Sequence, residues 1–309
     1  MQKLGEFFTF FRILLFIVIS TEHFYAQDVN QQLAITLSND KFADDDKYFT
    51  NGLYITYQKA VAQNFIFPKT DGNKLQLNIG IGNEIYSPAS LSSTNTDDFD
   101  RPFAGWLFGK LEVGSIKKKS AFFLAFETGI TGEESLAGDF QVGLHNVFGI
   151  DSRPTWVEQI GFKWLFNLKI THVFDWSNQR NAFQYRISPS LGTKDIYLEN
   201  DISYFFGRLN TFQNSSRTTI VDNSSSKEFY GYVSAGYRYV AHNTLIQGSI
   251  FTDDVLFTTD ITNHIFKTEI GAILQVKRNT FKIAYNFNTK ETPLSTSHIY
   301  GSLFYARSF

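Results

Sequence analysis

The feature that most constrains this chain is a two-residue alternation of apolar and polar side chains, which recurs almost to the last residue. Leucine or isoleucine occupies every second position from 75 to 81, and the segments 267–276 and 281–288 repeat the pattern. A period of two places the apolar side chains on one face of a β-strand. Segments of about ten such residues match the tilted strands that cross a bilayer.

These segments predict an all-β fold, a transmembrane antiparallel β-barrel of about twelve strands, with a short helix in an extracellular loop. A further candidate, 244–251, is assigned to a loop because single-chain bacterial barrels close with an even number of strands. The predicted strands are 33–38, 49–58, 75–85, 103–114, 120–131, 159–174, 182–191, 197–207, 228–240, 264–276, 280–288 and 298–309.

The bulk composition agrees with a barrel. Aromatic residues make up 17% of the chain, yet the mean hydropathy is only −0.18. Alternation of lipid-facing and lumen-facing residues produces this average. The net charge of −2 gives no overall basic field for nucleic acid, so no nucleic-acid partner is expected. The chain has no cysteine, which excludes thiolate metal sites, thiol nucleophiles and disulfides.

The first residues are typical of a cleaved export signal. Lys3 and Arg12 flank an aromatic stretch, and a short apolar core covers 13–19. That core is too short to span a bilayer, so we predict a signal peptide over 1–26 and a barrel over 27–309. The chain ends on an aromatic residue, Phe309, as expected of a barrel recognised by the assembly machinery of the bacterial outer membrane.

With both barrel termini on the periplasmic side, odd-numbered strands run outward. The basic turns at 117–119 and 277–278 then face the periplasm, where short turns belong. The stretches 39–48, 86–102 and 132–158 fall on the outer face. The connections 59–74 and 208–227 are long for periplasmic turns.

The first outer stretch is rich in acids. Asp40 and three consecutive aspartates at 44–46 follow Asn39. Oxygen ligands of this kind suit a hard cation such as calcium. The spacing does not fit an EF-hand loop, and an acidic outer loop taken alone is most often simply solvated.

The third outer stretch contains a helical pattern. Apolar residues recur at helical spacing between Phe140 and Phe148, and Gly149 is placed to end the helix. Gln141 and His145 are four residues apart and so share one face. A neutral histidine is the usual general base near pH 7, although most single histidines have no such role.

Several segments together resemble the outer-membrane lipid A 3-O-deacylases (LpxR type). They occur in the order found in that family and cover the amino-terminal half of the predicted mature chain. The second half resembles the family only in its strand rhythm and aromatic end. The matching segments are Asn39-Asp40, 46–52 (DKYFTNG), 85–88 (IYSP), 100–106 (DRPFAGW), Gln141-x-x-x-His145 and 154–160 (PxWxxQI).

The resemblance implies a barrel that binds lipopolysaccharide in the outer membrane and needs Ca²⁺ to hydrolyse an ester of lipid A. His145 matches the family's histidine that activates water, with Gln141 one turn before it. Asn39, Asp40 and Thr50 match other residues important for activity. Asp40 is the expected contributor to the metal site. Asn39 would orient water or polarise the carbonyl, and Thr50 would offer its hydroxyl or support the metal shell.

One departure from the family concerns a lysine expected shortly after the 85–88 segment. Counting without gaps places Ser93 there, and no Lys or Arg lies between Pro88 and Arg101. Such a cation would steady a lipid A phosphate or a developing oxyanion. Arg101 is the nearest replacement, although its motif favours a structural role.

Three alternatives remain open. The first is a barrel without catalysis, acting as a pore or a structural protein. The second is an outer-membrane phospholipase, which would use a serine nucleophile beside a strand-borne histidine. The third is a family member that binds lipopolysaccharide without cutting it. Because the chain has no Gly-x-Ser-x-Gly elbow and no cysteine, we predict attack by water rather than a covalent acyl-enzyme.

Overall fold

The computed structural model describes residues 30–43, 47–150, 152–178, 180–217, 220–221, 227–252 and 257–309. The predicted signal peptide over 1–26 and the aspartates at 44–46 lie outside the described residues. Within the described part of the chain, no helix is both long and apolar enough to cross a bilayer.

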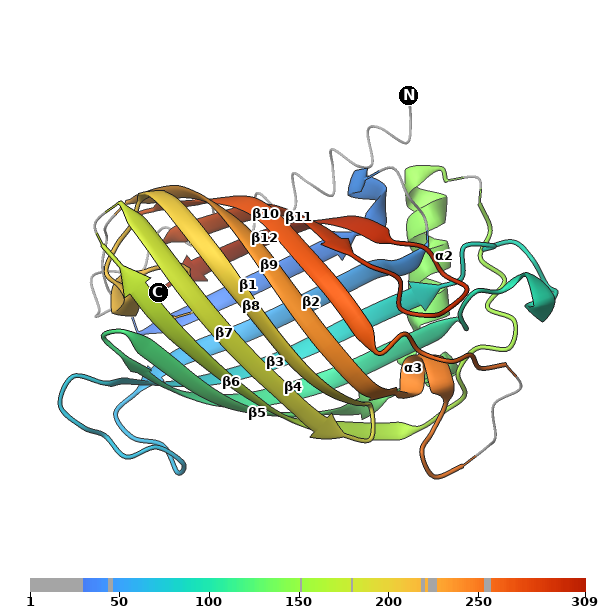
Figure 1. Cartoon of the computed structure of the whole chain (residues 1–309), viewed down its shortest axis with the longest axis horizontal. Helices are drawn as coiled ribbons and strands as arrows, with labels where there is room; N and C mark the ends of the chain where they lie inside the picture. Colours follow the sequence, from blue (N-terminus) through green and yellow to red (C-terminus); the bar gives the residue numbers. More distant parts are fainter. Residues whose placement is uncertain are drawn as a thin grey trace.

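Twelve antiparallel strands form a closed barrel, so the predicted fold and strand number are confirmed (Figure 1). Each strand pairs with its neighbours in sequence, and β1 pairs with β12 to close the wall. The strands are β1 (Gln31–Asn39), β2 (Tyr48–Val61), β3 (Lys74–Ser87), β4 (Ala104–Lys117), β5 (Ser120–Ile130), β6 (Trp164–Ser177), β7 (Asn181–Gly192), β8 (Asp195–Arg208), β9 (Glu228–Asn243), β10 (His264–Val276), β11 (Asn279–Asn288) and β12 (His298–Ser308).

Closure explains how these strands can stand in lipid. The β1–β12 register runs from Gln32 opposite Ser308 to Asn39 opposite Gly301. Every strand therefore has a partner on both sides, and no row of backbone N–H and C=O groups is left open to hydrocarbon.

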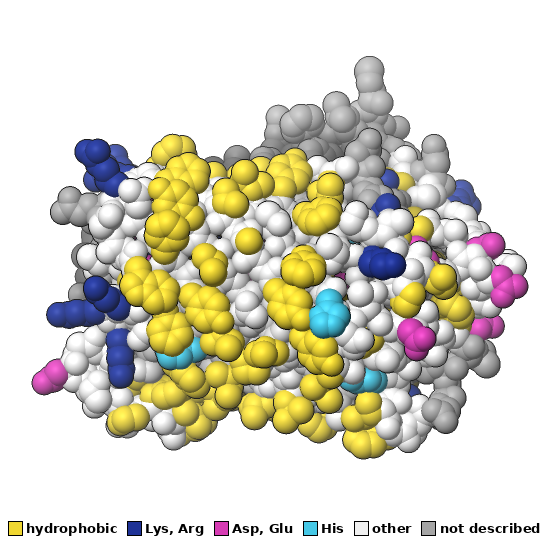
Figure 2. All heavy atoms as spheres, viewed as in Figure 1, with side chains coloured by type: hydrophobic (Ala, Val, Ile, Leu, Met, Phe, Trp, Pro, Cys, Tyr) yellow, Lys and Arg dark blue, Asp and Glu magenta, His cyan; other side chains and the backbone are white. Residues whose placement is uncertain are grey.

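The outer surface of the wall is an apolar band. Ile79 and Ile81 of β3 and Phe281 and Ile283 of β11 are about half exposed on alternate positions. Figure 2 shows this band across the middle of the molecule, with most Lys and Arg side chains at one end and most acidic ones at the other. We call the end that carries the long loops 88–103 and 131–163, opposite the carboxy terminus, the outer end.

One long connection at the opposite end folds inward. Within residues 209–221, Phe212 and Ile220 are buried in a cluster with side chains from β4, β5 and β6. The backbone N–H of Val221 donates to Gln76 Oε1 at 2.9 Å. The connection is long for a periplasmic turn because part of it fills this end of the barrel.

The outer end of the lumen is covered by the short helix α3 (Thr244–Gln247). Leu245 and Ile246 are 1% exposed, and Leu245 belongs to a cluster with Trp106 and Ile160. Residues 244–251 contain no strand, as predicted, although their first half forms α3 and is not a loop. The predicted strand 159–174 begins late, at Trp164, because Ile160 leaves the wall for this cluster.

Candidate active site at the outer end

The predicted helix is present as α2 (Ala137–Phe148), and it packs on the outside of the barrel wall. On the lipid-facing side of β3, Ile79 is 50% and Ile81 is 53% exposed, whereas Ile85 is 0% exposed. Asn83, between them, donates through Nδ2 to the carbonyl oxygen of Ser135 at 2.8 Å. The segment that begins α2 therefore covers the outer end of β3.

Gly105 of β4 allows this close approach. A Cβ atom at position 105 would lie 2.2 Å from the Cβ of Ala137 and 2.2 Å from Oγ of Ser135. Neither contact is possible without moving the helix or the strand, since carbon atoms in van der Waals contact are about 3.5–4.0 Å apart. This explains why the 100–106 segment contains a glycine at this position.

Gln141 fastens α2 to the wall. It is 2% exposed, and its Nε2 donates to Oγ of Ser87, the last residue of β3, at 3.1 Å. Its Oε1 accepts a hydrogen bond from Trp156 Nε1 at 2.9 Å. The side chain thus joins the helix, a strand end and the following loop.

His145 lies one turn further along α2 and is 7% exposed. Its Nδ1 is 2.7 Å from the backbone carbonyl oxygen of Ser152. A carbonyl oxygen only accepts, so Nδ1 carries the proton and donates it. In the neutral ring Nε2 is then the basic nitrogen, which is the form a general base requires. Gly149, with φ of 68°, ends the helix, and its N–H bonds to the His145 carbonyl oxygen.

Asn39 and Asp40 lie where β1 ends. Asn39 is the last residue of β1 and stands opposite Asn51 of β2, and its Oδ1 accepts the N–H of Lys41 at 2.8 Å. Asp40 begins the 3₁₀ turn η1 (Asp40–Ala43) and is 1% exposed. Its Oδ2 accepts the backbone N–H of Lys47 at 2.7 Å, which ties the start of β2 to the end of β1.

Thr50 occupies a β-bulge. Phe49 pairs with Tyr86 and Asn51 pairs with Ile85, so Thr50 is the extra residue between them. Its Oγ1 donates to the carbonyl oxygen of Ile85 at 3.3 Å, and the side chain is 3% exposed. Bulges re-aim side chains and are frequent beside active sites.

The start of β2 is strained and firmly held. Tyr48 has a φ of 63°, which is unusual for a residue other than glycine. Its hydroxyl donates to Asp100 Oδ2 at 2.7 Å and accepts the N–H of Thr296 at 2.9 Å. Two other outer loops therefore hold Tyr48 in place at the start of β2.

A short series of contacts links the Asn39–Asp40 turn to α2. Asp40 bonds to Lys47, the next residue Tyr48 pairs with Ser87, and Ser87 bonds to Gln141. The β1–β2 rim, the end of β3 and the helix that carries His145 therefore adjoin one another on the outside of the wall.

Ser93 and Arg101 lie elsewhere. Ser93 Oγ donates to Asp98 Oδ2 at 2.6 Å, and the Ser93 carbonyl accepts from Thr155 Oγ1 at 2.8 Å, so it organises two loops. Arg101 is 1% exposed, forms an ion pair with Glu291 at 2.9 Å and stacks on Tyr86. Its guanidinium thus connects the loop after β3 to the loop between β11 and β12.

Sequence reasoning missed several residues that build this site. Ser87 and Trp156 anchor Gln141, and both lie in the segments 85–88 and 154–160 that carried the resemblance. Asn51 follows Thr50 directly in the 46–52 segment and stands opposite Asn39. Their positions within those segments were the only signal that the sequence offered for them.

The residues at the β1–β2 rim fit a hard cation. Among the described residues, no three His, Cys, Asp or Glu side chains are grouped to hold a metal. Calcium, however, also takes amide, hydroxyl and carbonyl oxygens. Asp40 supplies a buried carboxylate, and the buried Oδ1 of Asn51 has no hydrogen-bond partner within the described part of the chain. This donor set is suited to calcium and not to metals that prefer sulfur or imidazole.

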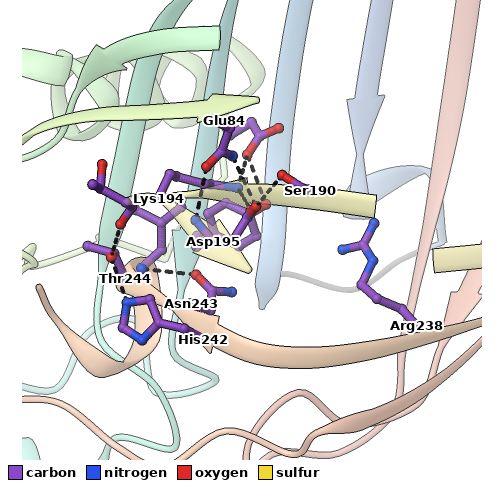
Figure 3. Close-up of polar contacts among 12 residues, drawn as sticks. Glu84, Ser190, Lys194, Asp195, Arg238, His242, Asn243 and Thr244 are labelled. Carbon is purple, nitrogen blue, oxygen red and sulfur yellow. Dashed lines mark hydrogen bonds and ion pairs between the residues drawn. The ribbon is translucent and has the colours of Figure 1, made fainter. Parts of the chain in front are cut away.

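A separate cavity of about 420 Å³ lies inside the lumen. Near its outer mouth Lys194 forms ion pairs with Asp195 at 2.8 Å and Glu84 at 3.7 Å (Figure 3). Burial lowers the pKa of Lys194, but these two carboxylates outweigh it and the pKa is raised well above its usual value. Thr244 of α3 donates its N–H to the Lys194 carbonyl at 2.8 Å, which seats the cap. The described lining includes none of the predicted site residues.

Comparisons with known proteins match both the sequence and the fold. A family model described as "Outer membrane protein LpxR" matches residues 10–309. The solved structure of LpxR from Salmonella typhimurium superposes with a TM-score of 0.73 at 21% identity, covering 90% of this chain and 100% of that chain. No curated protein matches at the sequence level.

Other solved barrels are less similar. An outer-membrane channel from Pseudomonas putida F1 gives a TM-score of 0.49 at 9% identity, covering 94% of this chain and 98% of that one. The β-domain of the Bordetella autotransporter BrkA gives 0.45 at 7% identity, covering 92% and 100%.

Proposed function

Because this chain belongs to the LpxR family of outer-membrane proteins, we propose that it is an ester hydrolase that removes an acyl chain from lipid A in the outer leaflet. The 3-O-linked chain is the expected target, from the resemblance of its motifs to the lipid A 3-O-deacylases. The observation that carries the proposal is the state and place of His145. The Ser152 carbonyl fixes its tautomer, and α2 holds it on the lipid-facing side of the wall at the outer end.

In the proposed reaction His145 Nε2 takes a proton from water while the water oxygen attacks the acyl carbonyl carbon. The bond between that carbon and the sugar oxygen then breaks, and the protonated imidazole returns its proton to the sugar oxygen. The products are a free fatty acid and a lipid A hydroxyl. Asn39 would orient the water or polarise the carbonyl.

Calcium is part of the proposal. Asp40 would hold it, with Thr50 supporting the ligands, and when bound it would supply positive charge beside the ester carbonyl. The absence of the family lysine, with Ser93 at its position, is the main reason to test activity directly. A protein that binds lipopolysaccharide without cutting it would show no release of fatty acid.

The site lies on the lipid-facing side of the barrel wall, and the substrate is itself a lipid of the outer leaflet. Lipid A esters lie at the boundary between headgroups and acyl chains, and α2 stands on the apolar wall near that level. Substrate would therefore approach sideways within the outer leaflet and would not pass through the lumen.

The other readings are less well supported. A pore is disfavoured because α3 covers one end of the lumen and residues 209–221 fill part of the other. A phospholipase of the kind considered above would carry its histidine on a strand beside a serine nucleophile, whereas His145 is carried by the helix α2.

We expect purified protein in detergent, given lipopolysaccharide and Ca²⁺, to release fatty acid, and His145→Ala to lower the rate by about 10²–10⁴-fold. His172→Ala, on β6, is the matched control and should leave the rate unchanged. Chelation should stop release by the wild type. Release from phospholipid instead of lipopolysaccharide, or equal rates for wild type and His145→Ala, would contradict the proposal.

A further inference from the structure

Asn51 is an internal asparagine of β2 on the outer face of the barrel. It stands opposite Asn39 of β1 and Ile85 of β3. Residues directly opposite on antiparallel strands share a face, so all three side chains lie on the side that α2 covers. Two residues further along β2, Leu53 pairs with Leu37 of β1 in the apolar part of the wall.

The amide oxygen of Asn51 is in an unfavourable environment as it stands. The residue is 3% exposed, and its buried Oδ1 has no hydrogen-bond partner among the residues that the structure describes. A buried acceptor without a partner costs free energy, and proteins rarely retain one without a reason. Such an atom is either bonded to something the protein alone does not supply or is a defect.

Its neighbours are rich in acceptors. Asp40 contributes a buried carboxylate, Asn39 an amide oxygen and Thr50 a hydroxyl whose proton is directed to the Ile85 carbonyl. Four oxygen-bearing side chains are thus carried by neighbouring positions at the outer ends of β1 and β2. Oxygen ligands of this kind are the ones that a hard cation prefers.

We propose that the Asn51 amide oxygen is a direct ligand of the divalent cation held by Asp40. In the cation-free protein this oxygen is an unsatisfied buried acceptor, and it gains its partner when the cation binds. The inference rests on the calcium requirement in the proposed function. It adds Asn51 to the residues that would bind the ion directly.

The test measures calcium binding and stability, apart from catalysis. Wild type, Asn51→Leu, Asn51→Asp and Asn286→Leu would be titrated with CaCl₂ by calorimetry in detergent. Asn286, a buried asparagine of β11 bonded to Ser302, is the matched control. Thermal unfolding with chelator would follow each variant without calcium.

We expect Asn51→Leu to weaken calcium binding by roughly tenfold or more, since even residues behind the direct ligands contribute that much. Asn51→Asp, which keeps an oxygen, should bind at least as tightly as wild type, and Asn286→Leu should bind as wild type does. Without calcium, Asn51→Leu should unfold at the same or a higher temperature, because it removes an unsatisfied acceptor.

The inference is overturned if Asn51→Leu binds calcium as wild type does, if the Leu and Asp variants both lose binding, or if wild type binds none. A lower unfolding temperature of calcium-free Asn51→Leu with unchanged calcium affinity would identify a structural role. Asn51-dependent binding without fatty-acid release would leave this inference standing and refute the hydrolase. If wild type releases fatty acid but Asn51→Leu binds calcium as tightly as wild type does, the hydrolase proposal stands and the inference about Asn51 is refuted.

Discussion

At the scale of single residues, the candidate site depends on local backbone features that no residue type announces. Thr50 is placed by a bulge, and Tyr48 before it has a positive φ held by Asp100 and Thr296. The sequence indicated His145, Asp40 and Thr50 because their chemistry and their motifs are distinctive. It did not indicate Asn51 or Ser87, since their importance comes from what stands opposite them.

Replacement of Thr50 by valine tests whether its hydroxyl has more than a structural role. Valine keeps the branched shape, and loss of the hydrogen bond to the Ile85 carbonyl should cost about 1 kcal/mol of stability. If the hydroxyl supports the metal shell or the water, fatty-acid release should fall on the order of tenfold or more. Urea unfolding and a release assay measure the two effects. An unchanged rate would assign Thr50 to the fold alone.

At the scale of elements, the twelve strands were predictable because alternation between lipid and lumen leaves a direct mark on the sequence. The helix α2 was also predictable from a local pattern, because its apolar residues recur with a period of about 3.6 and Gly149 marks its end. Its place on the outside of the wall was not. That place depends on Gly105, and a glycine in a strand pattern does not say what lies against it.

Replacement of Gly105 by valine should displace the start of α2 while leaving the barrel closed. Its Cβ would meet Ala137 and Ser135 at 2.2 Å, so the helix must move away from β4. We expect fatty-acid release to fall at least as far as in Thr50→Val, because His145 is carried by that helix. Gly109→Val is the matched control, since a Cβ there meets only a backbone oxygen at 3.9 Å.

Strand content by circular dichroism and the faster gel migration of folded barrels would show that both glycine variants still form the wall. Full activity of Gly105→Val would mean that the position of α2 does not matter for the reaction.

At the scale of the whole molecule, the barrel is a support for a site on its exterior. Its lumen holds ion pairs such as Lys194 with Asp195, the cap α3 and the inserted segment 209–221 (Figures 1 and 3). The sequence predicted closure and orientation, but the inward course of these connections was not predictable. It depends on contacts between distant segments, such as Val221 with Gln76, that carry no local pattern.

The most direct test of the account is the mass spectrum of lipid A from Gram-negative cells that express this chain. We expect wild type to produce lipid A lighter by one ester-linked acyl chain when calcium is present. His145→Ala, inserted in the outer membrane to the same level, should leave lipid A intact. Identical spectra from cells with wild type and with His145→Ala would contradict the central claim that His145 activates water at the outer end of the wall.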